Sequence, residues 1–408
     1  MLFVTVIVIL IIAYFVQRKL YRERTFENLT YSATLEADEV TVGDDVYMVE
    51  SLTNEKVLPL PYIKVATRLP EGLAFRLVTE DGEKSREIFT DSIESMFVMK
   101  GRQRIRRRWR VSCKKRGIYA LGDVHLVAND LIGFNPISHG IELPRSKGNT
   151  VTVLPAPVDL DRDFTSTRYF SGDVITPRSL LTDPMLRSGA RDYTTLDPMN
   201  RINWKLTASH GHLMVNVEEY VQKVQSNVIL NMTSQIIEHD PTVPENPEYI
   251  EYNITVAASL LERFTSENVP VRLIANTPPE TIHADFIASD DDTGRNILIT
   301  PAFCGKYGLL DAMRILATLE MKISMPVEKM LDYVVSNPHL FAENGNIVFV
   351  TAVLDERMIV FHREMLKRGI EVIFYVTTTN RVVALVPDDV KVFYRSYFDS
   401  YKVGAYHG

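Results

Sequence analysis

The second half of the chain is defined by the stretch Ile347-Val348-Phe349-Val350, a helical pattern from Arg357 to Lys367, Gly369, and Val372-Ile373-Phe374-Tyr375-Val376. Short, wholly apolar runs on both sides of a helix are typical of buried strands in a parallel sheet, whose two faces are both covered. Gly369 is expected to end the helix, because glycine adopts the left-handed conformation at little cost. This stretch therefore predicts an α/β domain.

The same alternation extends toward the amino terminus. Its elements are a strand at Val228-Ile229-Leu230, a helix from Tyr249 to Phe264, a strand at Val271-Arg272-Leu273-Ile274 and a helix from Tyr307 to Met321. We expect the α/β domain to cover residues 222–390, with an edge strand from Arg381 to Val386. Residues 391–408 are expected to form a tail that packs on this domain.

Residues 25–150 show a different pattern, of short alternating runs separated by turn residues. Glu39-Val40-Thr41-Val42 precedes Gly43-Asp44-Asp45, and Val46-Tyr47-Met48-Val49 follows. Several strands at this spacing predict an antiparallel β-sandwich. Residues 151–221 are interpreted as a connecting segment. The expected fold class is α+β multidomain: an N-terminal transmembrane helix, the sandwich, and an α/β Rossmann-like domain.

Residues 1–24 have the character of a membrane anchor with a basic flank. Met1 to Val16 carry no charge, and the polar and basic residues that follow at once are Gln17, Arg18, Lys19, Arg22 and Arg24. A cleavable signal carries its positive charge before the apolar run instead. Because positive flanks stay on the cytoplasmic side, we expect a single-pass protein of the cell membrane whose soluble part is cytoplasmic.

Composition and motifs argue against nucleic-acid binding, nucleotide cofactors and cysteine-based sites. The net charge of −7 gives no reason to expect a nucleic-acid partner. The chain contains no P-loop and no dinucleotide-binding fingerprint, so we expect no cofactor. Cys113 and Cys304 are too few and too distant for a disulfide framework or a zinc site, and both are expected to be buried thiols.

Two stretches resemble a known family. The first comprises Arg191-Asp192-Tyr193, Asp197, Arg201-Ile202-Asn203-Trp204-Lys205 and Thr207-Ala208, and the second comprises Lys115-Arg116-Gly117-Ile118-Tyr119 with Asn129-Asp130-Leu131-Ile132-Gly133-Phe134. They resemble the bacterial family called domain of unknown function 58. The resemblance implies a membrane-anchored β-sandwich, a signature segment and a von Willebrand factor A-like domain, with a MoxR-type AAA+ ATPase as partner. It implies no enzymatic activity, and we therefore expect a scaffold or adaptor in envelope or complex-assembly functions.

A von Willebrand factor A domain binds Mg²⁺ through an Asp-x-Ser-x-Ser loop after its first strand. The corresponding loop here is Asn231-Met232-Thr233-Ser234-Gln235, and the strand ending Val350-Thr351-Ala352 offers no carboxylate. Without these charges we expect no bound metal, because Mg²⁺ prefers anionic oxygen ligands. Asn231, Thr233 and Gln235 are expected to hydrogen-bond one another and to cap the following turn. The alternative is a metal-dependent ligand-binding receptor.

The signature segment supplies the candidate partner-binding residues, which are Arg191, Tyr193, Asp197, Arg201, Trp204 and Lys205. Asp197-Pro198 fits a helix N-cap followed by proline at the first helical position. We expect Asp197 to start the helix that carries Trp204, Arg191 to pair with Asp197, and Trp204 to anchor this helix to the α/β domain. The alternative is that these residues bind a partner directly. The segment lacks a nucleophile, base and orienting group, and His210 and His212 lack a third metal ligand.

One run places arginine at every second position. Its members are Arg102, Arg104, Arg106, Arg108 and Arg110. On a strand this pattern lines one face with positive charge. We interpret it as a solvated face balanced by acidic residues such as Glu83 or Glu94. The alternatives are that it binds anionic lipid headgroups, a negatively charged partner or RNA, and the first of these would make the β domain an anionic lipid or envelope-polymer binding module.

Overall fold

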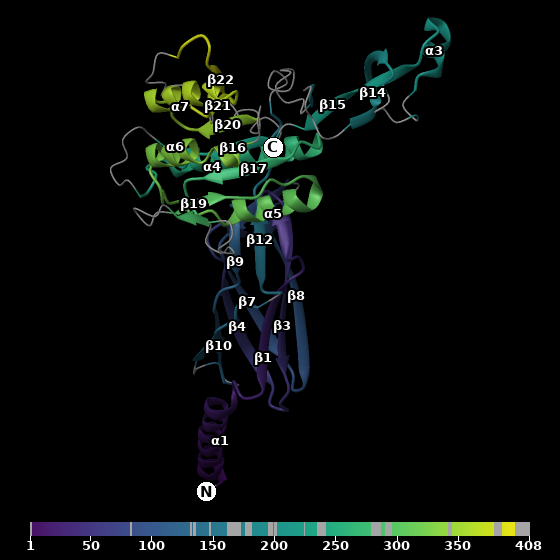
Figure 1. The fold of residues 1–408 in the computed structure, drawn as a ribbon. Coiled ribbons are helices and arrows are strands. Elements are labelled where there is room, and N and C mark those ends of the chain that lie inside the picture. The colour runs from purple at the N-terminus through teal and green to yellow at the C-terminus, as the bar shows by residue number, and fades with distance from the viewer. Residues whose placement is uncertain are drawn as a thin grey trace. The chain divides into compact units, whose positions relative to one another are not determined.

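The computed structural model describes residues 2–81, 84–130, 133, 136–146, 148–160, 173–175, 182–194, 199, 202–223, 225–234, 242–278, 287–289, 296–341, 345–378 and 386–395. The chain divides into two compact units (Figure 1). Unit 1 comprises residues 1–156 and 316–318, and unit 2 comprises residues 157–315 and 319–408. The fold is mixed α and β, with several antiparallel sheets.

Unit 1 begins with helix α1, Leu2–Arg24. The segment Phe3–Arg24 is long and apolar enough to cross a membrane, and none of its most apolar window is buried in the protein. Its last turn carries the basic residues Arg22 and Arg24, which suit the negative end of the helix dipole.

Two antiparallel sheets follow. The first has the order β1 (Leu29–Leu35), β3 (Asp45–Asn54), β8 (Gln103–Cys113), β5 (Leu73–Asp81) and β6 (Lys84–Thr90). The second has the order β11 (Ile137–Ile141), β10 (Val124–Ala128), β4 (Leu60–Arg68) and β7 (Ser92–Met99). Met48 and Phe75 from the first sheet share one buried core with Ile63 and Phe97 from the second. The predicted sandwich is thus confirmed.

A small third sheet joins β2 (Glu39–Thr41), β12 (Thr150–Leu154) and β9 (Gly117–Ala120). Val151 and Val153 of β12 are fully buried in the sandwich core. Residues 151–154 therefore belong to the sandwich and not to the expected connecting segment. The remainder of the expected connector also contains strands: β13 (Asp173–Ile175) and β14 (Thr182–Asp192) both pair antiparallel with β15 (Met214–Lys223).

The main sheet of unit 2 has seven strands. Their order is β18 (Ile287–Ser289), β19 (Asn296–Ile299), β17 (Val271–Ala275), β16 (Ser226–Leu230), β20 (Asn346–Thr351), β21 (Glu371–Val376) and β22 (Lys391–Tyr394). The strands from β17 to β22 in this order are parallel, whereas β19 pairs antiparallel with β17 and β18 pairs antiparallel with β19.

Helices cover both faces of this sheet (Figure 1). The helices of unit 2 include α4 (Pro247–Ser266), α6 (Val327–Ser336), α7 (Glu356–Lys367) and α5 (Gly305–Thr318) up to residue 315. Ile229, Phe349 and Phe374 share a buried core with α6 and α7. Alternate residues such as Val228 and Val350 point to the opposite face, and α4 contacts the same strands. The alternation of strand and helix predicted from the sequence is confirmed.

Several details differ from the expectations. Lys391–Tyr394 form β22 beside β21 and are not a tail, while the expected edge strand at 381–386 lies almost wholly outside the described residues. Helix α6 was not predicted, because Pro326 and Pro338 leave only ten helical residues between them. Cys113 is buried as expected, but Cys304 is exposed because it precedes α5 in a loop.

Candidate functional site

The carboxyl edge of the parallel sheet is where the strand order reverses. The chain passes from β16 to β17 on one side and later returns to β20 on the other side of β16. In open α/β sheets the loops at such a reversal form the usual ligand site. Asn231 follows β16 there, and Thr351 ends β20 beside it.

Asn231 is the centre of a hydrogen-bond network at this edge. Its side-chain amide donates to Thr351 Oγ1 at 3.1 Å, and its Oδ1 accepts the Thr233 backbone N–H at 3.1 Å. Oδ1 also accepts a hydrogen bond from Asn276 Nδ2 at 3.2 Å. The expected hydrogen bond between Asn231 and Thr233 is confirmed, and it is made by the Thr233 backbone N–H. Gln235 and the turn that these residues were expected to cap lie outside the described residues.

Two further asparagines extend this network. Asn276, directly after β17, accepts the Met232 backbone N–H at 2.8 Å and donates to the Met325 carbonyl at 3.1 Å. Asn253, on α4, donates to the Asn231 carbonyl at 3.3 Å and accepts from Thr377 Oγ1 at 2.6 Å. Four strand ends and one helix are therefore joined by neutral side chains.

These side chains are closed to solvent and satisfied. Asn231, Asn253, Asn276, Thr351 and Thr377 are all fully buried, and their buried side-chain N and O atoms all have a hydrogen-bond partner. The part of the chain that the structure describes contains no group of three His, Cys, Asp or Glu side chains that could hold a metal ion. The donor set does not fit Mg²⁺, because it offers neutral oxygens that are already engaged and no carboxylate.

The signature segment forms the end of the β14–β15 hairpin and carries helix α3, Trp204–His210 (Figure 1). The N-cap of α3 is Asn203, whose side chain accepts the Leu206 backbone N–H at 3.1 Å. The expectation that Asp197 starts this helix is therefore wrong. Asparagine is as good an N-cap as aspartate, and it immediately precedes the helix. Asp197 and Arg201 themselves lie outside the described residues.

Helix α3 buries none of its residues. Trp204 is 65% exposed, so the expectation that it anchors this helix to the α/β domain is also wrong. Lys205 and Arg191 are exposed, and Tyr193 is half-buried. Arg191 donates to the Asp192 backbone carbonyl at 3.1 Å. A short helix with no buried face, joined to a hairpin, presents an exposed aromatic side chain to solvent.

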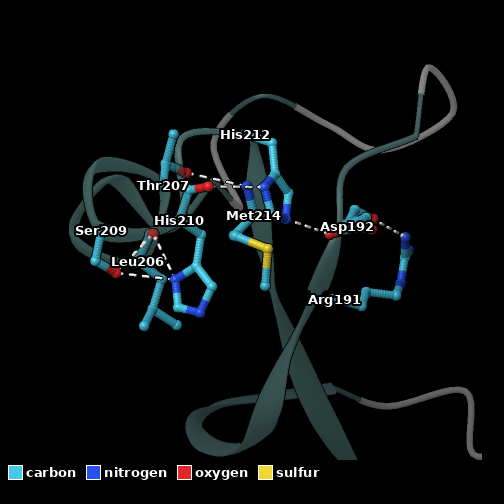
Figure 2. A network of polar contacts seen from close by, with 8 residues as sticks. All are labelled: Arg191, Asp192, Leu206, Thr207, Ser209, His210, His212 and Met214. Carbon is cyan, nitrogen blue, oxygen red and sulfur yellow. Dashed lines mark hydrogen bonds and ion pairs between the residues drawn. The ribbon is translucent and has the colours of Figure 1, made fainter.

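His210 is the last residue of α3 and His212 follows it, and each histidine has its own polar partner (Figure 2). Ser209 Oγ lies 2.9 Å from His210 Nδ1, whereas Asp192 Oδ1 lies 2.9 Å from His212 Nε2. A serine-based proton relay needs the hydroxyl and the carboxylate on the same imidazole. Because Ser209 and Asp192 contact different histidines, this arrangement does not assemble such a relay.

Strand β8 carries four of the five arginines of the basic run. Arg104, Arg106, Arg108 and Arg110 are exposed and alternate with half-buried residues along the strand. Arg102 precedes the strand in a turn with φ of 53°, so it does not continue the row as expected.

The charges that balance this row also differ from the expectation. Arg108 pairs with Glu36 at 2.5 Å and lies over the Tyr47 ring, 3.7 Å from its centroid. Arg110 donates to Tyr47 Oη at 3.1 Å. Glu94 instead pairs with Lys64, because it points from β7 of the other sheet, and Glu83 lies outside the described residues.

No protein-family model matches the chain, and no curated protein matches it in sequence. Solved structures show low similarity. The sporulation control protein Spo0M of Bacillus subtilis is 13% identical with a TM-score of 0.18, and the match covers 31% of this chain and 49% of that one. The CARDB domain of the PF1109 protein of Pyrococcus furiosus, crystallised with di-metal ions, is 12% identical with a TM-score of 0.18, covering 31% and 91%. A non-cellulosomal cohesin from Archaeoglobus fulgidus is 12% identical with a TM-score of 0.19, covering 34% and 99%. TM-scores this low carry no argument about function.

Sequence reasoning found Asn231 and Thr233 but missed Asn253, Asn276 and Thr377. A signal was present for each. Asn253 sits beside Ile254 on the buried face of the predicted helix, and Asn276 and Thr377 immediately follow apolar strands. Polar residues at such positions are buried with partners, because an unpaired buried amide costs about 1–3 kcal/mol.

Proposed function

We propose that this protein is a membrane-anchored, non-enzymatic adaptor, with α1 as its anchor and the α/β unit and its α3 hairpin as its binding part. The observation that carries the proposal is the network around Asn231. At the edge where an α/β domain usually holds its ligand, the described strand ends are joined by buried neutral side chains that bond one another.

A von Willebrand factor A-like origin of this domain belongs to the same proposal. It is supported by the position of the loop Asn231–Ser234, which follows the first strand of the parallel sheet. In such a domain this loop would hold the metal. We propose that amide and hydroxyl bonds replace the metal here and hold the strand ends together, so that binding of a partner does not depend on a divalent ion.

The α3 hairpin is the surface that we propose for the partner. Tryptophan is enriched among the residues that dominate binding energies at interfaces, and Trp204 is 65% exposed next to Lys205. The family resemblance suggests a MoxR-type AAA+ ATPase as this partner. The basic end of α1 favours a cytoplasmic position for this hairpin, on the side where such an ATPase would be found.

The test uses the full chain in a lipid nanodisc and the purified MoxR-type ATPase of the same organism. We expect saturable binding that is weakened about thirtyfold by Trp204→Ala, since hot-spot tryptophans contribute roughly 2 kcal/mol or more. Tyr307→Ala is the matched control, because Tyr307 is an 87% exposed aromatic residue on α5. Absence of binding, or equal loss in both variants, would contradict the proposal.

A further inference from the structure

Helix α1 does not lead into the sandwich through a free linker. Tyr21 is 1% exposed, and its hydroxyl donates to the Pro59 carbonyl in the loop between β3 and β4 at 2.9 Å. One turn earlier, Gln17 Nε2 donates to Asp130 Oδ2 at 3.2 Å. Residues four apart lie on the same side of a helix, so this side of α1 rests against the base of the sandwich.

These contacts hold Pro59 of the β3–β4 loop and Asp130, which follows β10, at a set position along α1. They involve residues Gln17 and Tyr21, which lie among the basic side chains that follow the apolar part of α1. In an anchored protein such basic residues lie at the level of the lipid headgroups. The loop between β3 and β4 is therefore held at headgroup level too.

A hollow of about 530 Å³ opens at this junction. It is lined by Leu20 and Arg24 of α1, by Glu27 after the helix, and by Lys56 and Val57 of the β3–β4 loop. Val57 is 71% exposed and Leu20 is 38% exposed. Two cationic side chains and the Glu27 carboxylate thus lie beside two exposed apolar side chains. The positive charges outnumber the negative one, so the combination matches an amphiphile with an anionic head.

Lys56 is held in position by the backbone. Its ammonium group donates to the Thr25 carbonyl and, at 2.8 Å, to the Glu27 carbonyl. An ammonium group has three donors, so one remains for a ligand. Arg24 supplies up to five donors in a planar fork that suits phosphate oxygens.

We propose that this hollow binds the headgroup of an anionic phospholipid, with its phosphate between Arg24 and Lys56 and an acyl chain against Leu20 and Val57. The inference rests on the proposed membrane anchoring and adds to it a specific lipid site. Such a site attaches the β-sandwich to the bilayer at a second point beside α1 and so restricts its orientation relative to the membrane.

Native mass spectrometry of the full chain in mild detergent tests the site, with phosphatidylglycerol, phosphatidylcholine and inorganic phosphate as probes. We expect one phosphatidylglycerol to be retained about tenfold more strongly than phosphatidylcholine. Both lipids carry the phosphate, but the choline ammonium group of phosphatidylcholine is repelled by the two cationic side chains of the hollow. Inorganic phosphate that competes as well as the lipid would overturn the lipid assignment.

Matched variants locate the binding. Arg24→Gln should reduce retention about tenfold by loss of one charged partner, whereas Arg22→Gln, which removes the same charge outside the hollow, should not. Val57→Asp should also reduce retention, whereas Val98→Asp should not, because Val98 is an equally exposed valine on the outer face of β7. Equal effects within either pair would overturn the site.

Flotation of the same chain with phosphatidylcholine vesicles separates the two proposals. A protein that floats but shows no preference for phosphatidylglycerol would overturn the lipid site alone. A protein that does not float with any vesicle would overturn the anchoring, and with it the site.

Discussion

The side-chain amide of Asn231 donates a 3.1 Å hydrogen bond to Thr351 Oγ1, and so ties the carboxyl ends of two neighbouring parallel strands, β16 and β20. Thr351 Oγ1 in turn donates to the Val353 carbonyl at 2.7 Å. The donors and acceptors of these two hydrogen bonds are all uncharged groups. A negative charge at Asn231 would remove a donor and leave an anion in a fully buried place.

Asn231→Asp should therefore destabilise the protein. We expect a loss of about 2–4 kcal/mol in the free energy of unfolding, since a buried carboxylate without a cation is costly. Urea unfolding of the full chain measures it, with and without Mg²⁺. Asn203→Asp is the control and should be neutral, because aspartate caps an exposed helix as well as asparagine does.

Magnesium provides the decisive comparison for this variant. If Mg²⁺ stabilised the Asn231→Asp variant to above the wild-type level, or if the wild-type chain bound Mg²⁺ in a calorimeter, the loop would be a metal site after all. The metal-dependent receptor would then replace the adaptor as the proposed function.

Glu50 makes the stability of the sandwich depend on pH. The residue is 2% exposed between the sheets, and burial raises the pKa of its carboxyl, although Trp109 Nε1 donates to it at 3.1 Å. At a pH between the pKa of Glu50 in the unfolded chain and its raised pKa in the folded protein, the native state keeps a proton that the unfolded chain has lost. This contribution to stability is full below the unfolded pKa and is lost as the pH rises through the folded pKa.

Glu50→Gln should remove this dependence and raise the free energy of unfolding near neutral pH by roughly 1 kcal/mol. Urea unfolding at several pH values, followed by tryptophan fluorescence, measures it. The background should carry Trp204→Phe, because the chain has two tryptophans and Trp109 then reports on the sandwich alone. An unchanged slope with pH would contradict the assignment to Glu50.

Lys56 predicts that lipid retention falls in alkaline buffer. Burial lowers the pKa of Lys56 to about 8, against the opposing charge of Glu27. Phosphatidylglycerol retention should therefore decline as the pH rises through about 8. Arg24 and Glu27 are the other charged groups that line the hollow. In Lys56→Arg the decline should vanish, because a guanidinium keeps its charge.

The same shift has an opposite consequence for folding. Because the pKa of Lys56 falls from 10.5 to about 8 on folding, the native state binds fewer protons between these values. The contribution of Lys56 to the free energy of unfolding should then rise with pH across this window. A contribution that falls there would contradict the burial of Lys56.

His362 predicts a stabilising substitution. The side chain is 2% exposed on α7 and lies near Phe374, and neither ring nitrogen has a hydrogen-bond partner among the described residues. Because buried unpaired polar groups cost about 1–3 kcal/mol, His362→Leu should stabilise the protein by roughly 1 kcal/mol. Thermal unfolding measures it. Met365→Ala on the same helix is the contrast, with an expected loss of about 2–5 kcal/mol.

Local patterns predicted most of the elements. The apolar runs at Val228 and Val372 became β16 and β21, and the helix expected from Arg357 to Lys367 differs from α7 by one residue. The alternating apolar and polar residues of the first third of the chain form the strands of the sandwich. These predictions succeeded because a residue's burial period depends on the backbone geometry of its own segment.

Predictions about the signature segment failed because they needed the surroundings of the segment. Asp197-Pro198 resembles a helix start, but the helix begins at Trp204 and its N-cap is Asn203. The Asn203 backbone N–H also donates a hydrogen bond to the Met214 carbonyl at the start of β15. Trp204 has a large apolar side chain of the kind that is usually buried, and yet it is exposed. Hydrophobic character alone does not say whether a neighbouring element arrives to cover a side chain.

Residue type and short spacing were enough to establish the apolar helix at the start, the two kinds of sheet and the neutral residues Asn231 to Gln235 after β16. They could not establish that Asn231 meets Asn253, Asn276 and Thr351, or that Tyr21 reaches Pro59, which the folded chain alone reveals. The contacts of Asn231 with Asn253 and Thr351 join residues 22 and 120 positions apart. Such contacts follow from the order in which the strands are placed in the sheet, which no local pattern encodes.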